Sequence, residues 1–328
     1  MRAIYLNTAT DHGLDALTIG ERPQPQPAAE EILVRVHAVG LNPVDYKLIE
    51  GGNKKWQYPH ILGLDVAGEI VALGPQVSGF AVGERVFYHG DLTKDGGFAE
   101  YATVKSYAVA KMPAELSYEQ AAALLCGAMT AYAALYRKAS LANRHTVLIH
   151  AGAGGVGGIA VQLAKHSGLT VYTTASSRKR ALAKRLLPDH IIDYQTTDVT
   201  AAIKELTHGH GVDLIINTVG TKEATADLQR LAYNGALVTI VGGPDLSDHA
   251  LEQRGQSWLS VNLGGAHQSN NLQQQTDLAV MAAELGKLVV AKQLDPLIER
   301  VLAFEQIPQG LQALKQHLIS GKVVARLN

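Results

Sequence analysis

Residues 151–157 decide the fold of this chain, and they read Ala151-Gly152-Ala153-Gly154-Gly155-Val156-Gly157. The glycines have the spacing G-x-G-x-x-G, directly after an apolar run at 145–150 and at the start of a helical pattern that continues to residue 166. A strand, such a turn and a helix in this order bring backbone N–H groups and a helix N-terminus toward a pyrophosphate. The spacing alone is a weak signal, and a turn that only packs strand against helix is the alternative. The context favours a dinucleotide-binding site.

The segments around this turn alternate between apolar runs and amphipathic stretches. Continuously apolar strands that are each followed by a helix predict a doubly wound parallel sheet covered on both faces, so the fold class is α/β. Ser117 and Gln120 form a capping-box pair that begins a further helix. The expected strands are 145–150, 169–174, 190–194, 212–219 and 236–241, and the expected helices between them are 155–166, 178–187, 198–207 and 222–233.

Upstream of residue 115 the sequence has a different pattern of apolar and turn-forming residues. Runs of β-branched residues at 31–36, 68–72 and 85–88 are separated by Gly, Pro and Asn, which predicts a mostly antiparallel β domain. After the α/β block, the pattern indicates an amphipathic helix at 272–285 and a terminal strand at 321–327. A single strand in that position is expected to return to the first domain.

The composition narrows the class of protein. The 328 residues carry 29 Lys and Arg against 30 Asp and Glu, a net charge of −1, which disfavours nucleic acid and anionic membranes as partners. Cys126 is the only cysteine, so no internal disulfide forms and a reducing, cytoplasmic location is expected. The N-terminus has no apolar stretch of signal-peptide length, and no stretch approaches the roughly 18 uninterrupted apolar residues of a membrane span.

The region after the glycine-rich turn favours one nicotinamide cofactor over the other. A site for NAD usually has an acidic residue about 20 residues further on, which binds the adenosine ribose. No Asp or Glu occurs from residue 158 to residue 188, where hydroxyl groups and cations suit a 2′-phosphate instead. A solvated basic helix face is the alternative for part of this cluster, but it does not explain the missing acid. NADP(H) is therefore expected, and the basic residues of the window are Lys165, Arg178, Lys179, Arg180, Lys184 and Arg185.

Several further segments carry a resemblance to a known family. In their order and spacing, they make the chain similar to the medium-chain dehydrogenase/reductase superfamily, in its zinc-independent quinone oxidoreductase-like branch. The resemblance implies a GroES-like catalytic domain at 1–122 and 267–328 around a Rossmann domain at 123–266, with the active site in the cleft between the two. The segments are NPVDYK at 42–47, GLDVAGEI at 63–70, GFAVGERV at 79–86, GGFAEY at 96–101, the 151–157 turn and GKVV at 321–324.

The same resemblance implies which residues contact the cofactor. Asn217 stands where relatives often carry Asp, a departure to which no effect is assigned. The expected contacts are Thr130 on the nicotinamide side; Ala153, Gly154, Gly155 and Val156 at the pyrophosphate; Ser176, Ser177, Arg178, Lys179 and Tyr194 around the 2′-phosphate; and Val219, Gly220, Val241, Gly242, Leu263 and Gly264 beside the nicotinamide.

The zinc-binding positions of related enzymes are changed in this chain. Zinc-dependent relatives use three protein ligands and keep one position open. Here Asp45 stands at the first ligand position, Leu64 at the second and Cys126 at the third. Leucine cannot bind a metal, so no metal is expected, although an improvised site from Asp45, Asp65, Cys126 and a nearby His60 or His89 is the alternative.

Hydride transfer without a metal favours acceptors that are already electron-poor, namely quinones and α,β-unsaturated carbonyl compounds. Asn42 and Tyr46 are the candidates for hydrogen bonds to the developing oxyanion, and Asp65 either orients the pocket or caps a turn. A turn asparagine and a packed tyrosine are the structural alternatives. Enoyl-thioester reductases usually place a Tyr proton donor where this chain has Asn53 and Lys54, so an enoyl-thioester reductase is a less favoured alternative. A zinc-type alcohol dehydrogenase and a non-catalytic NADPH-binding protein are further alternatives.

The stretch 257–263 bears on assembly because it alternates like a strand and follows the last strand of the α/β block. An apolar edge strand is a ready surface for two-fold pairing. Relatives pair subunits in this region, so a homodimer is expected.

Overall fold

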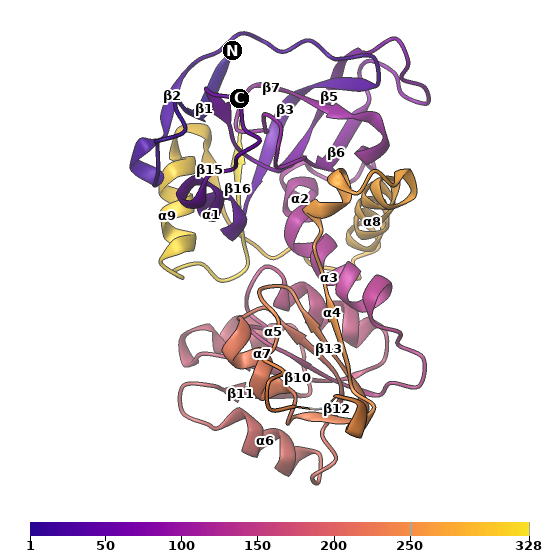
Figure 1. The fold of residues 1–328 in the computed structure, drawn as a ribbon. Coiled ribbons are helices and arrows are strands. Elements are labelled where there is room, and N and C mark those ends of the chain that lie inside the picture. Colours follow the sequence, from indigo (N-terminus) through magenta and orange to yellow (C-terminus); the bar gives the residue numbers. More distant parts are fainter. Residues whose placement is uncertain (250, 328) are drawn as a thin grey trace. The chain divides into compact units, whose positions relative to one another are not determined.

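The structure is a computed structural model that describes residues 1–249 and 251–327. The chain divides into two compact units, the first spanning residues 1–129 and 264–328 and the second residues 130–263. The predicted boundaries, 122/123 and 266/267, lie seven residues before the first and three residues after the second of these. Each unit is described by itself (Figure 1).

The first unit is built on a seven-stranded, mostly antiparallel sheet, as the β-branched runs predict. Its last strand in sequence, β16, pairs antiparallel with β3, with Val324 opposite Gly40, so the terminal strand does return to the first unit. The strands in spatial order are β15 (Ile298–Ala303), β16 (Lys322–Arg326), β3 (Glu31–Leu41), β5 (Asp65–Leu73), β6 (Arg85–His89) and β8 (Ala110–Lys111), and β7 (Tyr101–Lys105) also pairs with β3.

A smaller antiparallel sheet and several helices complete the first unit. In Figure 1, α9 and α1 lie side by side, which agrees with their contacts. Alternate residues of the strands and the inner faces of these helices form one apolar core that includes Ile32, Val66 and Leu311. The smaller sheet has the order β2 (Thr18–Glu21), β1 (Arg2–Leu6), β4 (His60–Ile61), and the helices are α1 (Pro43–Gly51), α2 (Tyr118–Ala123), α8 (Leu272–Val290) and α9 (Ile307–Lys315).

The second unit is the predicted doubly wound sheet, and all its strand pairs are parallel. The strand order reverses at β9, which places β10 on one side and β12 on the other, as in a Rossmann fold. The spatial order is β11 (His190–Asp193), β10 (Thr170–Ala175), β9 (Thr146–Ile149), β12 (Val212–Asn217), β13 (Leu231–Thr239) and β14 (Ser257–Ser260), and the helices are α3 (Thr130–Ala133), α4 (Gly157–His166), α5 (Arg180–Arg185), α6 (Val199–Leu206) and α7 (Thr221–Asp227).

One secondary-structure prediction is wrong at its end. The expected helix at 222–233 stops at Asp227, and residues from Leu231 onward belong to β13. Leu231 is fully buried and pairs with Val212, whose N–H donates to the Arg230 carbonyl. Pairing with a neighbouring strand, which the local helical spacing does not reveal, therefore decides the conformation of this segment.

The predicted capping box is confirmed. The Gln120 N–H donates to Ser117 Oγ over 3.2 Å, and the Ser117 N–H donates to Gln120 Oε1 over 3.0 Å. The helical path after α2 is not one regular helix, because the π-helical turns η3 (Leu125–Met129) and η4 (Ala134–Lys138) flank α3. The short 3₁₀ segments are η1 (Leu14–Ala16), η2 (Ser106–Ala108), η5 (Ser177–Lys179), η6 (Leu251–Arg254), η7 (Gly264–Gln268) and η8 (Phe304–Gln306).

Among the described residues, no helix combines the length and the apolarity that crossing a bilayer requires.

Candidate functional site: a nucleotide-binding sheet edge and a buried polar cluster

The glycine-rich turn connects β9 to α4 in the second unit. Ala151 has a φ of 54°, and its carbonyl accepts a 2.8 Å hydrogen bond from the Gly154 N–H, which closes the turn tightly. The Gly158 N–H then donates to the Gly154 carbonyl over 2.9 Å and begins the helical ladder. The turn therefore leads directly into a helix N-terminus, where N–H groups without helical partners attract an anion.

Two glycines of the turn are required by close approach. A Cβ on Gly152 would lie 2.0 Å from Thr173 Oγ1, and a Cβ on Gly157 would lie 2.3 Å from the Ala151 carbonyl oxygen. Neither position has room for a side chain, whereas a Cβ on Gly154 would meet only the Ala151 carbonyl oxygen, at 3.2 Å. These are the tight-turn, backbone-approach and helix-packing roles of a dinucleotide-binding turn, so the residues fit a nicotinamide dinucleotide.

A buried hydrogen-bond network ties together the strand ends beneath this turn. His150, which follows β9, contacts Asp227 Oδ1 through Nε2 over 2.9 Å. Asn217, at the end of β12, donates to Asp227 Oδ2 over 2.7 Å, and Arg230 also donates to Oδ1 of Asp227 over 2.7 Å. Although burial acts to raise it, His150, Asn217 and Arg230 hold the pKa of Asp227 below its ordinary value. The carboxylate is thus a fixed anion that joins β9, β12 and α7.

Asn217 also forms hydrogen bonds to Val219 and Gly220, two of the predicted cofactor residues. Its Oδ1 accepts hydrogen bonds from the Val219 N–H over 2.8 Å and from the Gly220 N–H over 3.1 Å. Val219 is 57% exposed, which is high for an apolar side chain, and Gly220 has a φ of 143°. The loop after β12 is therefore held by its backbone while the Val219 side chain faces outward.

The predicted 2′-phosphate residues gather where β10 and β11 end. β10 stops at Ala175, and Ser176, Ser177, Arg178 and Lys179 follow in the next turn. Tyr194 follows β11 and is 55% exposed. The parallel pairing of the two strands thus brings together residues that the sequence separates.

The remaining predicted cofactor residues lie on different segments. Thr130 begins α3 and is buried. Val241 and Gly242 follow β13, and Val241 is 38% exposed. Leu263 ends the second unit, and Gly264 begins the returning part of the first.

A second cluster of polar side chains is buried in the first unit. Asn42, at the start of α1, donates from Nδ2 to Asp65 Oδ2 over 2.8 Å and accepts a 2.6 Å hydrogen bond at Oδ1 from Lys322 Nζ. The Lys322 ammonium also lies 3.6 Å from Asp65 Oδ2 and donates to the Leu41 carbonyl over 3.3 Å. Both the nitrogen and the oxygen of the Asn42 side-chain amide thus have hydrogen-bond partners within the cluster.

Asp45 and Asp65 have unusual acidities in this cluster. Burial and the neighbouring Asp65 carboxylate raise the pKa of Asp45 to about 8. Burial also raises the pKa of Asp65, against the opposing effect of Lys322. Asp45 Oδ2 accepts the Asn42 N–H over 2.7 Å, and its Oδ1 is one of the few buried atoms without a hydrogen-bond partner among the described residues. Asp45 is thus expected to be largely protonated at neutral pH.

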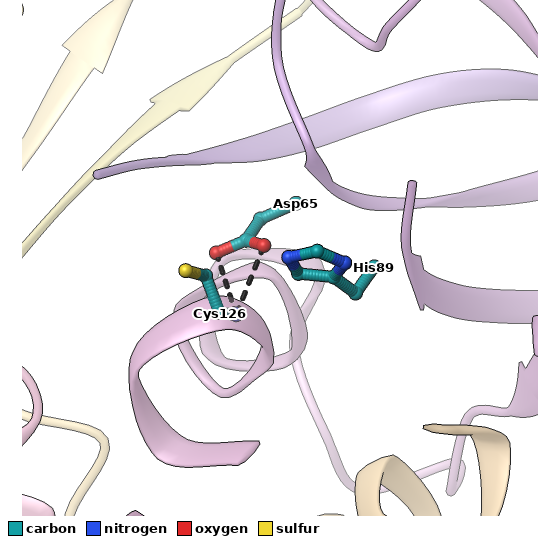
Figure 2. Close-up of side chains that lie close together, drawn as sticks. All are labelled: Asp65, His89 and Cys126. Carbon is teal, nitrogen blue, oxygen red and sulfur yellow. Dashed lines mark hydrogen bonds between the residues drawn. The ribbon is translucent and has the colours of Figure 1, made fainter. Parts of the chain in front are cut away.

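The cluster includes a three-residue group that resembles a metal site. One ligand atom from each of Asp65, His89 and Cys126 lies within 4.8 Å of the other two. Figure 2 shows the Asp65 carboxylate facing the Cys126 backbone and the His89 ring, with dashed lines for the hydrogen bonds of 2.9 and 3.0 Å that Cys126 N–H makes to the carboxylate. Burial lowers the pKa of His89 to about 3 and raises the pKa of the Cys126 thiol, so the imidazole and the thiol are both neutral.

These residues do not fit a zinc ion. Both Asp65 oxygens accept hydrogen bonds, and the Lys322 ammonium, 3.6 Å from Oδ2, already provides a positive charge and repels another cation. Leu64, at the second ligand position, is buried and offers no donor atom.

Tyr46 and a group of aromatic residues lie in the same unit. Burial raises the pKa of Tyr46, so its phenol stays protonated and able to donate. Trp56 stacks on His60 with ring centroids 4.2 Å apart. Asp45, Trp56 and His60 all line a small cavity of about 10 Å³.

Three residues of these sites are not predicted from the sequence, namely Lys322, Asp227 and Asp193. Lys322 lies in the recognised GKVV segment, but nothing in its neighbours reveals that it meets Asp65. Asp227 and Asp193 were not singled out either, although a carboxylate near the end of a strand or in a following helix is a usable signal. Their partners become visible only through the strand pairing and packing of the fold.

Comparison with known proteins agrees with the two-part architecture. Residues 28–114 match the family model described as alcohol dehydrogenase GroES-like domain, and residues 155–271 match the one described as zinc-binding dehydrogenase. The human quinone oxidoreductase is 32% identical over 218 residues, which is 66% of this chain and 66% of that protein. The human synaptic vesicle membrane protein VAT-1 homolog is 30% identical over 331 residues, 95% of this chain and 83% of that protein.

A solved structure extends the likeness over the whole fold. The CurK enoyl reductase superposes with a TM-score of 0.86 at 28% sequence identity and covers 100% of this chain and 99% of its own. Together with the matched family models and relatives, the fold assigns the chain to a family: it belongs to the medium-chain dehydrogenase/reductase superfamily, in the quinone oxidoreductase-like branch.

Proposed function

We propose that this protein is an NADPH-dependent oxidoreductase that transfers hydride to a quinone or an α,β-unsaturated carbonyl compound without a metal. The observation that carries the proposal is the glycine-rich turn between β9 and α4, at the point where the strand order of the parallel sheet reverses. Ligands of such sheets bind at this point.

The preference for NADPH is supported by the turn after β10. Ser176, Arg178 and Lys179 follow the second strand of the sheet, where the adenosine ribose of a dinucleotide is recognised. A guanidinium and an ammonium bind a phosphate more strongly than they bind a ribose hydroxyl. Tyr194, exposed after the neighbouring strand, adds a phenol to the same edge.

Metal-free chemistry is supported by the residues of the buried cluster. The matched family model is described as a zinc-binding dehydrogenase. In this chain, however, Leu64 interrupts the ligand set and Lys322 supplies the positive charge beside Asp65. When bound, the reduced nicotinamide supplies the hydride. A quinone or an enone spreads the negative charge that it receives, so it needs less electrophilic help than a simple ketone, and water protonates the resulting oxyanion or enolate.

The three predicted catalytic residues are given different roles in this proposal. Tyr46 keeps its proton and is the group that would donate a hydrogen bond to the acceptor oxygen. Asn42 donates a hydrogen bond to Asp65 and accepts one from Lys322. Asn42 and Asp65 are therefore proposed as positioning residues for the start of α1, the helix that carries Tyr46. All three assignments stay predictions until variants are measured.

The quaternary structure and the location belong to the same proposal. β14 is the last strand of the sheet, and Trp258 on it is 41% exposed, which suits pairing with a second copy of the chain. A homodimer in a reducing compartment such as the cytoplasm is therefore proposed. Light scattering that gives the mass of a monomer would contradict the dimer.

One experiment tests the proposed activity. NADPH and NADH oxidation is followed with an ortho-quinone, a para-quinone, an enone, an enal, an enoyl-CoA and a simple aldehyde, each with and without a chelator. We expect NADPH oxidation with quinones or enones that the chelator does not change. Chelator-sensitive reduction of the aldehyde would refute the metal-free proposal, turnover of the enoyl-CoA alone would favour the thioester reductases, and tight NADPH binding without oxidation would make the protein a non-catalytic binder.

A further inference from the structure

The end of β11 brings a carboxylate to the proposed 2′-phosphate site. β11 pairs with β10 in parallel register, and Asp193 lies opposite Ala175, the last residue of β10. The stretch after β10 contains no acidic residue in sequence, which is why NADP(H) is expected. In the fold, the missing acid is supplied by the adjacent strand.

Asp193 is bound directly to a residue of the predicted phosphate site. The Ser177 hydroxyl donates a hydrogen bond to Asp193 Oδ2, and the Gln195 N–H donates to Oδ1 over 3.0 Å. The hydrogen bond from Ser177 lowers the pKa of Asp193, so the carboxylate is ionised at neutral pH. The nearby Arg180 adds a smaller stabilising charge.

This contact has two consequences for a 2′-phosphate. A serine hydroxyl has one hydrogen to donate, and Ser177 gives that hydrogen to Asp193 rather than to a ligand. The carboxylate also lies beside the turn that would hold the phosphate, and two anions a few ångströms apart repel each other. A ribose with free hydroxyls meets neither penalty, because a carboxylate accepts hydrogen bonds from it.

We propose that Asp193 is a specificity-determining residue that weakens the preference for NADPH over NADH set by Arg178 and Lys179. The inference rests on the proposed use of a nicotinamide dinucleotide. Two opposing groups therefore act at one site: the cations after β10 favour the 2′-phosphate, and the carboxylate at the end of β11 disfavours it. Substitution of the Asp193 carboxylate alone is expected to increase the preference for NADPH over NADH.

The test is the Asp193→Asn variant, whose amide oxygen still accepts a hydrogen bond from Ser177. Binding is measured by calorimetry with NADPH, NADH and the fragments 2′,5′-ADP and 5′-AMP, so that no turnover is needed. The ratio of the NADH and NADPH dissociation constants should rise several-fold, because the variant loses one negative charge beside a phosphate that carries nearly two. The increase should shrink at high salt, because salt screens exposed charges.

Asp189→Asn is the matched control. It removes the same charge just before the other end of β11, where Asp189 pairs with Lys165 over 2.8 Å and accepts the Val171 N–H over 2.7 Å. Its selectivity ratio should equal that of the unmodified protein. A ratio in Asp193→Asn that is unchanged or lower would overturn the inference. If the unmodified protein binds no dinucleotide at all, the proposed function itself fails, which is a distinguishable result.

Discussion

Removing the buried ammonium of Lys322 is the sharpest perturbation of the first unit. In Lys322→Met, a side chain of similar length fills the space, but Asp65 and Asn42 lose their cation. Lys322 and Asp65 are almost completely buried, with 4% and 0% of their side chains exposed. Breaking such a pair by removing one partner typically costs about 3–5 kcal/mol of unfolding free energy. We expect a loss of that size at pH 8.

The loss should depend on pH in a defined direction. Burial already raises the pKa of Asp65 above its unfolded value, and loss of the Lys322 charge raises it further. A carboxyl group with a raised pKa destabilises the fold as pH rises through that pKa, and it has no such effect below the unfolded pKa, where both states are protonated. Asp65 takes up a proton at lower pH and no longer needs a cation. The difference between variant and parent should therefore fall to about 1–2 kcal/mol at pH 5.

The assay is urea unfolding followed by tryptophan fluorescence. The chain has two tryptophans, so both proteins carry Trp258→Phe, which leaves the buried Trp56 as a reporter within the first unit. A double-mutant cycle with Asp65→Asn separates the ion pair from the loss of packing, because the Lys322 substitution should cost much less when Asp65 is already neutral. An equal loss at pH 5 and pH 8, or an equal loss with Asn at position 65, would refute the reasoning.

Three further outcomes are expected. Asp45→Asn should become more stable relative to the parent protein as the pH rises from 5 to 9, as measured by urea unfolding. The pKa of Asp45 is raised to about 8, so ionisation of this carboxyl group disfavours the folded parent. An identical pH profile for the two proteins would contradict this. Arg178→Ala with Lys179→Ala should raise the KM for NADPH about 10–100-fold in steady-state assays and leave that for NADH unchanged. Gly157→Ala should abolish dinucleotide binding in calorimetry while circular dichroism stays native-like, because its Cβ would lie 2.3 Å from the Ala151 carbonyl oxygen.

Local patterns of the sequence were enough to predict most of the architecture. The glycine-rich turn, the capping box of Ser117 and Gln120 and the alternation of apolar and amphipathic segments involve residues within a few positions of one another, so nearest-neighbour chemistry decides them. The wrong helix end near Leu231 marks the limit of such patterns. There the pairing of β13 with Val212 overrides the local helical spacing.

The electrostatics of both sites were decided by the tertiary structure. Lys322 and Asn42 are 280 residues apart in the chain, and only the return of β16 to β3 brings the ammonium to the buried carboxylates. Asp193 reaches Ser177 because β11 lies beside β10, not because of its place in sequence. Burial then shifts the pKa values of Asp45 and Asp65, which no composition reveals. The sequence determined which chemical groups are present, while the fold decided their neighbours and hence their charges, because Coulomb and hydration energies depend on distance and burial in space.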